Sequence, residues 1–210
     1  MPNEDGVRIS TLILSIVNPL VAILLAWWLN YRISSSKDVA ILELELDNGD
    51  DCIAISEGDY NDGLGRVPRC YVRLRLNVKG SPNGAKRCDL RLLGVYRLES
   101  NIDVVQLRYP NKKSLHWNTE WKSGTHVEKD LSHGAVQYVN LLKTQSIGGN
   151  VTVMITDDGD TWLDLQMNNT YRFEVQAIAG NAKAVGRMVD VKLGQDYNKI
   201  SIERSRSIKY

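Results

Sequence analysis

The stretch "YVRLRLNVKGSPNGAKRCDLRLL", residues 71–93, alternates apolar and polar residues on both sides of a short turn sequence. From residue 72 to residue 78 every second residue is Val or Leu, and the residues between them are Arg or Asn. A period of two predicts a β-strand with one buried face and one wet face. The cluster "GSPNG" (80–84) is typical of a turn, so we predict that 71–79 and 85–93 form a hairpin.

The same alternation occurs elsewhere in the chain. In "VAILELELD" (39–47) leucines alternate with acidic residues. Further strand candidates are 51–56, 102–109, 134–143, 150–156, 170–179, 184–193 and 198–204. No sustained 3.6-residue period follows residue 37. Many short strands at even spacing predict an antiparallel β-sandwich, which we expect to be immunoglobulin-like.

One resemblance agrees with this fold. Residues 70–95, "CYVRLRLNVKGSPNGAKRCDLRLLGV", resemble a hairpin of bacterial immunoglobulin-like domains of the CARDB type. Within 115–142, "LHW" and "LSHGAVQYVNLL" resemble later strands of such domains. The resemblance implies that Ala85 and Cys88 take the small positions between the sheets. It also implies an adhesive or scaffolding role, and it carries over no catalytic residue.

The N-terminal part has a different character. In "STLILSIVNPLVAILLAWWLNYRISSSKD" (10–38) no charged residue occurs between Arg8 and Arg32. As a helix, residues 9–31 would be about 34 Å long, enough to cross a hydrocarbon core of about 30 Å. No small-x-small cleavage site follows, which disfavours a signal peptide. The expected organisation is an N-terminal flank (1–8), a transmembrane helix (9–31), a linker (32–38) and a β-sandwich (39–210).

The end of this helix predicts how the chain sits in a cell membrane. Trp27, Trp28, Tyr31 and Arg32 form an expected aromatic and basic belt at the bilayer interface. Arg8 alone precedes the helix, whereas Arg32 and Lys37 follow it. The positive-inside rule then favours a cytoplasmic C-terminal domain in a single-pass protein. An odd number of cysteines, three, agrees with a reducing compartment.

One stripe of the predicted helix carries small and polar residues. Its members are Thr11, Ser15, Asn18, Ala22 and Ala26. Such a stripe allows close approach of a second helix, so we consider a protein partner or a homo-oligomer joined through it. The alternative is an ordinary anchor whose short polar side chains bond their own backbone.

Charge is segregated along the chain. Residues 38–62 hold nine acids and no base, and residues 66–97 hold nine bases and one acid. One interpretation is a cross-strand ladder of ion pairs between 39–47 and 71–79. The other is a basic surface aimed at anionic lipid headgroups or an acidic protein. Its candidate residues are Arg73, Arg75, Lys79, Lys86, Arg87 and Arg91. A net charge of +1 and the lack of interleaved aromatic residues argue against nucleic acid.

Residues with catalytic potential are few. His116, His126 and His133 match no zinc spacing, and we expect "LHW" to bury His116 beside Trp117. No nucleophile-elbow motif occurs. The acidic turn "TDDGD" (156–160) offers Asp157, Asp158 and Asp160 as candidate calcium ligands, although the same residues are ordinary turn formers. We therefore expect no cofactor.

These observations favour a non-enzymatic function. The expected protein is a membrane-anchored binding or scaffolding module, or a subunit of a membrane complex assembled partly through its helix. An extracytoplasmic adhesion or sensing domain is the first alternative, and it differs mainly in orientation. A membrane-bound hydrolase or metal-dependent enzyme is the second, and it would require a convergent cluster of titratable groups.

Overall fold

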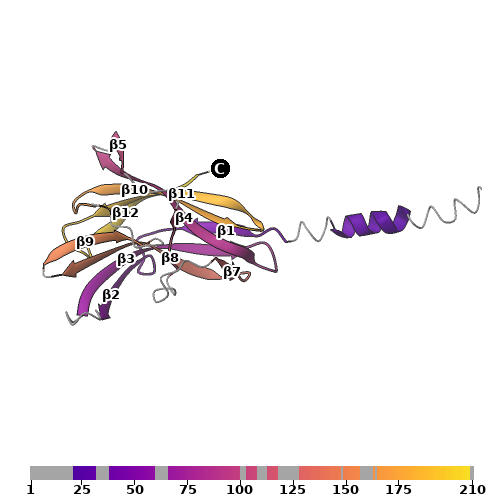
Figure 1. Cartoon of the computed structure of the whole chain (residues 1–210), viewed down its shortest axis with the longest axis horizontal. Helices are drawn as coiled ribbons and strands as arrows, with labels where there is room; N and C mark the ends of the chain where they lie inside the picture. The colour runs from indigo at the N-terminus through magenta and orange to yellow at the C-terminus, as the bar shows by residue number, and fades with distance from the viewer. Residues whose placement is uncertain are drawn as a thin grey trace, which may run out of the picture. The chain divides into compact units, whose positions relative to one another are not determined.

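Figure 1 shows the computed structural model of the chain, which describes residues 21–31, 38–59, 66–99, 103–107, 113–117, 128–147, 149–156, 163 and 165–208. The chain divides into two compact units, Met1–Val39 and Ala40–Tyr210. The first contains a helix at residues 21–31. The second contains all of the described strands.

The described strands follow one another along the second unit. They are β1 (Ile41–Glu45), β2 (Ile53–Asp59), β3 (Arg66–Lys79), β4 (Ala85–Glu99), β5 (Asp103–Gln106), β6 (Lys113–Ser114), β7 (Lys129–Leu131), β8 (Val136–Ile147), β9 (Asn150–Ile155), β10 (Thr170–Ala179), β11 (Ala182–Leu193) and β12 (Ile200–Ile208).

Two antiparallel sheets are built from these strands. The first sheet has the order β1-β3-β8-β9, and β2 also pairs with β3. The second sheet has the order β12-β11-β10-β4-β5, and β6 and β7 also pair with β4. The predicted antiparallel, mainly β architecture is therefore confirmed, with two sheets arranged as a sandwich (Figure 1).

The predicted hairpin of residues 71–79 and 85–93 is wrong. Strand β3 belongs to the first sheet and β4 to the second, so the turn at 80–84 carries the chain from one sheet to the other. Gly80 and Gly84 have φ angles of 84° and 71° there. A Cβ atom on Gly84 would lie 2.0 Å from the carbonyl oxygen of Leu131, so only glycine fits this turn.

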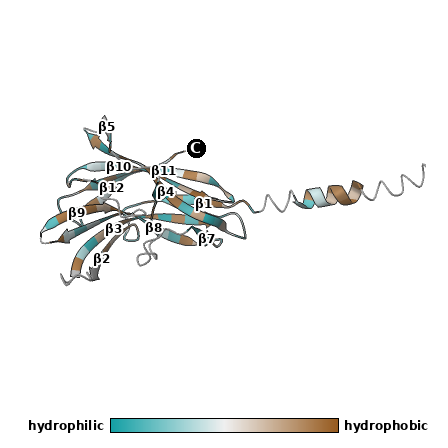
Figure 2. Cartoon of the chain, in the orientation of Figure 1, coloured by the Kyte–Doolittle hydropathy of each residue, from teal (hydrophilic) through white to brown (hydrophobic). Residues whose placement is uncertain are grey.

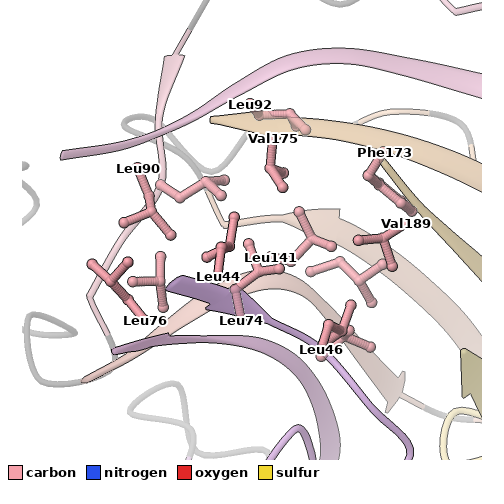
Figure 3. Close-up of a cluster of buried hydrophobic side chains, with 14 of the residues drawn as sticks. Leu44, Leu46, Leu74, Leu76, Leu90, Leu92, Leu141, Phe173, Val175 and Val189 are labelled. Atoms are coloured by element: carbon pink, nitrogen blue, oxygen red, sulfur yellow. The ribbon is translucent and has the colours of Figure 1, made fainter. Parts of the chain in front are cut away.

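The leucines of these two strands explain why they separate. Leu74 and Leu76 of β3, and Leu90 and Leu92 of β4, are completely buried. Figure 3 shows these side chains in one cluster, with residues of other strands from both sheets between and beside them. Two apolar faces bury more surface when they face each other across a core than when they lie side by side in one sheet.

A short segment ties the two sheets together at one edge. Residues 113–117 begin as β6 on β4, and the Leu115 N–H donates to the Leu90 carbonyl at 2.7 Å. Two residues later, Trp117 forms an antiparallel bridge with Val139 of β8, in the other sheet. The segment therefore contributes to both sheets, and both Leu115 and Trp117 are buried in the core.

Asn181, in the turn between β10 and β11, joins three parts of the domain. Its side-chain oxygen accepts the Lys86 backbone N–H at 2.8 Å, and its side-chain nitrogen donates to the Gly84 carbonyl at 2.9 Å. Its backbone carbonyl accepts the Ala40 N–H at 2.8 Å. One residue thus holds the start of β4 and the start of β1 on the β10–β11 turn.

Most of the predicted strands are present, but their first and last residues differ from the predicted ones. Strand β3 begins at Arg66, five residues before the predicted start at residue 71, and includes Pro68. Strands β6 and β7 were not predicted, because two and three residues are too few to show a period.

We predict that Asn181→Ala lowers the free energy of unfolding by about 1–2 kcal/mol, because two side-chain hydrogen bonds to backbone groups are lost. Urea unfolding followed by tryptophan fluorescence measures this change. The matched control is Asn150→Ala, since Asn150 is exposed and its replacement should leave the midpoint unchanged. Equal effects of the two substitutions would contradict the assigned role of Asn181.

Candidate functional site

The helix at residues 21–31 exposes apolar side chains on all of its sides. Its eight large apolar or aromatic residues are each between 47% and 67% exposed. The rings of Trp27 and Tyr31 stack with centroids 6.0 Å apart. In Figure 2 the helix is most hydrophobic toward its N-terminal end and more polar toward its C-terminal end. A helix that is apolar all round requires a lipid or protein environment to cover it.

This helix is shorter than the predicted transmembrane span of residues 9–31. Eleven residues rise about 16 Å. Among the described residues there is no helix with both the length and the apolar character needed to cross a membrane. Residues 9–20 lie outside the described part of the chain.

Only some of the residues predicted for the anchor lie in the described part of the chain. Trp27, Trp28 and Tyr31 lie on the described helix, and Arg32 lies outside the described residues. Of the helix-association stripe, Ala22 and Ala26 are on the helix and exposed. The other members, Thr11, Ser15 and Asn18, lie outside the described residues.

Acidic and basic residues pair across β1 and β3. Strand β1 runs antiparallel to β3 with Glu45 opposite Arg75. The Arg75 Nε donates to the Glu45 carboxylate at 2.9 Å, and the Lys79 ammonium lies 2.7 Å from Glu43. The ladder interpretation of the segregated charges is therefore confirmed for these two strands. We call Glu43, Glu45, Arg75 and Lys79 the acid–base ladder.

Hydrogen bonds within the ladder shift the pKa of Glu45 and the pKa of Lys79. The hydrogen bond from Arg75 is the main reason that the pKa of Glu45 is lowered. The hydrogen bond to Glu43 likewise raises the pKa of Lys79. Within the ladder each charge therefore has a partner of opposite sign.

The basic residues of β4 also have acidic partners. Lys86 lies 3.2 Å from Asp130, which also accepts the Arg87 backbone N–H at 2.8 Å. These bonds, the one from Arg87 first, lower the pKa of Asp130. Arg91 donates to Asp89 at 2.7 Å, and the Asp89 side chain is only 2% exposed. Asp130 was not recognised from sequence, because it comes from β7, 43 residues after Arg87.

The six candidate residues of the basic surface are divided between the two sheets. Arg73, Arg75 and Lys79 lie on β3, and Lys86, Arg87 and Arg91 lie on β4. Four of the six take part in ion pairs. The guanidinium of Arg73 lies over the Tyr71 ring, 5.4 Å from its centroid. The structure therefore does not bring the six together on one sheet.

A further ion pair on the second sheet was not predicted. Arg172 of β10 donates two hydrogen bonds, of 2.7 and 2.8 Å, to the carboxylate of Asp190 on β11. Asp190 is 4% exposed, and the bond to it raises the pKa of Arg172. In the sequence each of these two residues is a charged residue between two apolar ones, which indicates a strand. That they pair with each other follows only from the register of β10 with β11.

The histidines and acidic turns do not converge on a site within the described residues. His116 is half-buried, whereas Leu115 and Trp117 on either side are buried, so the expectation of a buried His116 is wrong. His133 is exposed, and His126 lies outside the described residues. Asp157, Asp158 and Asp160 also lie outside the described residues. In the described ranges no three His, Cys, Asp or Glu residues are grouped as metal ligands.

The three cysteines are free thiols in the interior. Cys52, Cys70 and Cys88 are each no more than 1% exposed, and none forms a disulfide. Burial is the main cause that raises the pKa of Cys52, and it raises the pKa of Cys70 and Cys88 to about 11. A thiol with such a pKa is almost entirely protonated at neutral pH and is a poor nucleophile.

Comparison with known proteins gives no match for this chain, whether with family models, curated proteins or solved structures.

We predict that the native chain reacts with Ellman's reagent at pH 8 with less than one thiol per molecule, and with three thiols after unfolding in guanidinium chloride. Burial and a raised pKa both slow the reaction. Ser201→Cys, at an exposed position of β12, is the control and should add one rapidly reacting thiol. Rapid stoichiometric reaction of a native cysteine would contradict the burial described above.

Proposed function

We propose that this protein is a single-pass, membrane-anchored β-sandwich that serves as a binding or scaffolding module. The observation that carries the proposal is the helix at residues 21–31, whose large apolar side chains are all exposed. A water-soluble helix normally has a polar face, and this one has none wide enough to face solvent. Lipid is the environment that suits such a surface on all sides.

The sequence before the helix supports an anchor of full length. Residues 9–20 contain no charged residue and are mostly apolar, so they can continue the helix toward the N-terminus. Residues 9–31 would then match the thickness of a hydrocarbon core. Trp27, Trp28 and Tyr31 would lie at the headgroup level, where amphipathic rings are favoured. The bilayer is thus the first proposed partner.

The β domain supports a role in recognition through its surface. Its ion pairs satisfy charge within the domain, on both sheets, and its thiols are buried. We propose an immunoglobulin-like sandwich, in which strand edges and loops supply contacts and no group acts as a catalyst. Strand edges recognise partners mainly through backbone hydrogen bonds, which need no charged surface.

Helix–helix association would make the protein a subunit of a larger membrane complex. This part of the proposal rests on the stripe of small and polar residues in the sequence, which includes Asn18 and Ala22. Small residues permit close packing of helices in lipid, and an asparagine can hydrogen-bond across the pair. Anionic headgroups would add contacts to basic side chains near the bilayer surface.

We predict that the full-length protein stays in the membrane pellet after extraction with alkaline carbonate. Leu24→Arg combined with Leu25→Arg should release it, because each arginine costs about 2.5–3.5 kcal/mol near the centre of a membrane helix. The control combines Ile55→Arg with Val136→Arg, two similarly exposed apolar residues of the β domain. Release of the unchanged protein by carbonate would overturn the proposed anchor.

We predict a cytoplasmic position for the β domain. A pair of reporters fused after Tyr210, one active only in the cytoplasm and one only outside it, distinguishes the two orientations. Activity of the cytoplasmic reporter alone is expected. Activity of the other reporter would replace this proposal with an extracytoplasmic adhesion or sensing domain, in which calcium binding by the 156–160 turn becomes the next experiment.

A further inference from the structure

One end of the β domain is formed where the two sheets meet at Asn181. The first sheet contributes the start of β1, the end of β3 and the start of β8, and the second contributes the start of β4 and the turn between β10 and β11. The Ala40 N–H donates to the Asn181 carbonyl, so the chain passes from the first unit into the domain here. We call it the Asn181 end.

Two exposed apolar side chains lie at this end, on the outer face of the first sheet. Ile41 and Val136 are 54% and 48% exposed, and only one other large apolar side chain among the described residues from 40 to 208, Ile55, is exposed. Ile41 lies opposite Lys79, and Val136 lies opposite Asn77. Directly opposed side chains share a face. Lys79 and Asn77 each follow a core residue, so all four side chains point away from the core.

Lys79 lies between these two apolar side chains. It is directly opposite Ile41 and diagonal to Val136, at about 7–8 Å by the geometry of antiparallel pairs. Its ammonium lies 2.7 Å from Glu43, but the Lys79 side chain is 60% exposed. An exposed pair of this kind contributes little to stability, so the ammonium is available to another anion. We call Ile41, Lys79 and Val136 the Ile41 patch.

The second sheet adds exposed basic side chains to the Asn181 end. They belong to Lys86, Arg87 and Lys183. Lys86 pairs with Asp130 at 3.2 Å, and both side chains are more than half exposed. Lysine has a long apolar stem and a charged tip, so lysines beside exposed apolar residues suit the boundary between water and a bilayer. Basic side chains near a membrane are also attracted to anionic headgroups.

The length of the chain before the domain keeps this end close to the proposed anchor. The described helix ends at Tyr31 and the domain begins at Ala40, so residues 32–39 join them. Fully extended, this segment spans at most about 29 Å. An anchor that holds Tyr31 at the headgroup level therefore presents the bilayer to the Asn181 end at a high effective concentration.

We infer that the Ile41 patch is a membrane-contact surface, on which Ile41 and Val136 enter the headgroup region of a phospholipid bilayer and Lys79 binds lipid phosphate. The inference rests on the proposed anchor and adds the face that the domain turns toward the membrane. It applies to either orientation of the chain, because both leaflets present phosphate.

Contact at the patch orients the whole domain, because the two sheets are joined along the β1 side as well as at the Asn181 end. Asn48, which follows β1, donates to the Ile202 carbonyl of β12 at 3.0 Å and accepts the Ile202 N–H at 2.6 Å. The two sheets therefore tilt together. The opposite end of the sandwich, which includes the turn between β11 and β12, is then turned away from the membrane and toward a soluble partner.

Fluorescence quenching in vesicles tests this inference with the full-length chain. Ser132→Cys places a thiol in the turn before β8, beside the patch, and Ser201→Cys places one at the opposite end, at the start of β12. Both positions are exposed, and the native thiols are buried. Each variant is labelled with bimane and reconstituted into phosphatidylcholine vesicles, with or without headgroup spin-labelled phosphatidylcholine. We expect the spin-labelled lipid to quench the label at position 132 several-fold more than the label at position 201.

Two charge variants separate contact at the patch from the effect of tethering alone. Val136→Glu should reduce quenching at position 132 several-fold, because lipid phosphate repels a carboxylate. Ile41→Glu should act in the same way. Ile55→Glu makes the same change at an exposed apolar residue of β2 and should leave the quenching unchanged. Circular dichroism shows that each variant keeps its β-sheet content. Equal quenching at positions 132 and 201, or quenching that survives both patch variants, would overturn the inference.

Flotation of the same vesicles in a density gradient separates this inference from the anchor. A chain that does not float with the vesicles would reject the anchor and the patch together. A chain that floats but shows equal quenching at the two positions would reject the patch alone. Quenching at position 132 that falls as the ratio of protein to lipid rises would assign the patch to a second copy of the chain and overturn lipid contact.

Discussion

The packing of β3 leucines against β4 leucines across the interior is the constraint on which the domain is built. Among the described strands these two are the longest, and although they are consecutive in the chain they lie in opposite sheets. Each then pairs within its own plane, β3 with β1, β2 and β8, and β4 with β10 and the short strands β5, β6 and β7. The pairs β1–β3, β3–β8 and β4–β10 join distant parts of the chain, and long-range pairing of this kind is typical of slow-folding β-sandwiches.

The outer faces of the sheets follow a second rule, the pairing of opposite charges at cross-strand positions. The acidic and basic runs of the sequence look like two separate patches when they are read along the chain. In the structure Glu43 and Glu45 meet Lys79 and Arg75, and the bases of β4 meet Asp89 and Asp130. Charge segregation in the sequence therefore reflects the pairing of β1 with β3, whereas the acidic partners of β4 lie outside the acidic run 38–62.

Alternation of apolar and polar residues was sufficient to predict most strands and the β1–β3 ladder, since it depends only on side-chain direction. It could not predict in which sheet a strand lies. The turn at 80–84 has the residues of a hairpin turn, and only the pairing of β3 and β4 with strands of different sheets shows that the chain changes sheets there. The bonds of Asn181 and Asn48 and the Arg172–Asp190 pair were beyond prediction because each depends on the relative placement of strands distant in sequence or on an exact register. The apolar run before residue 32 is evident in the sequence. Its composition alone does not define where the helix begins and ends.

The bonds of Asn181 also have a mechanical meaning. Any load carried by the N-terminal segment enters the sandwich at Ala40, whose N–H is bonded to the Asn181 carbonyl. Asn181 passes that force to the start of β4 and to the β10–β11 turn, in the second sheet, while β1 passes it to β3 in the first. Tension at the entry point is thus divided between both sheets. Pulling β1 off β3 from its N-terminal end requires that the hydrogen bond between Ala40 and Asn181 break first.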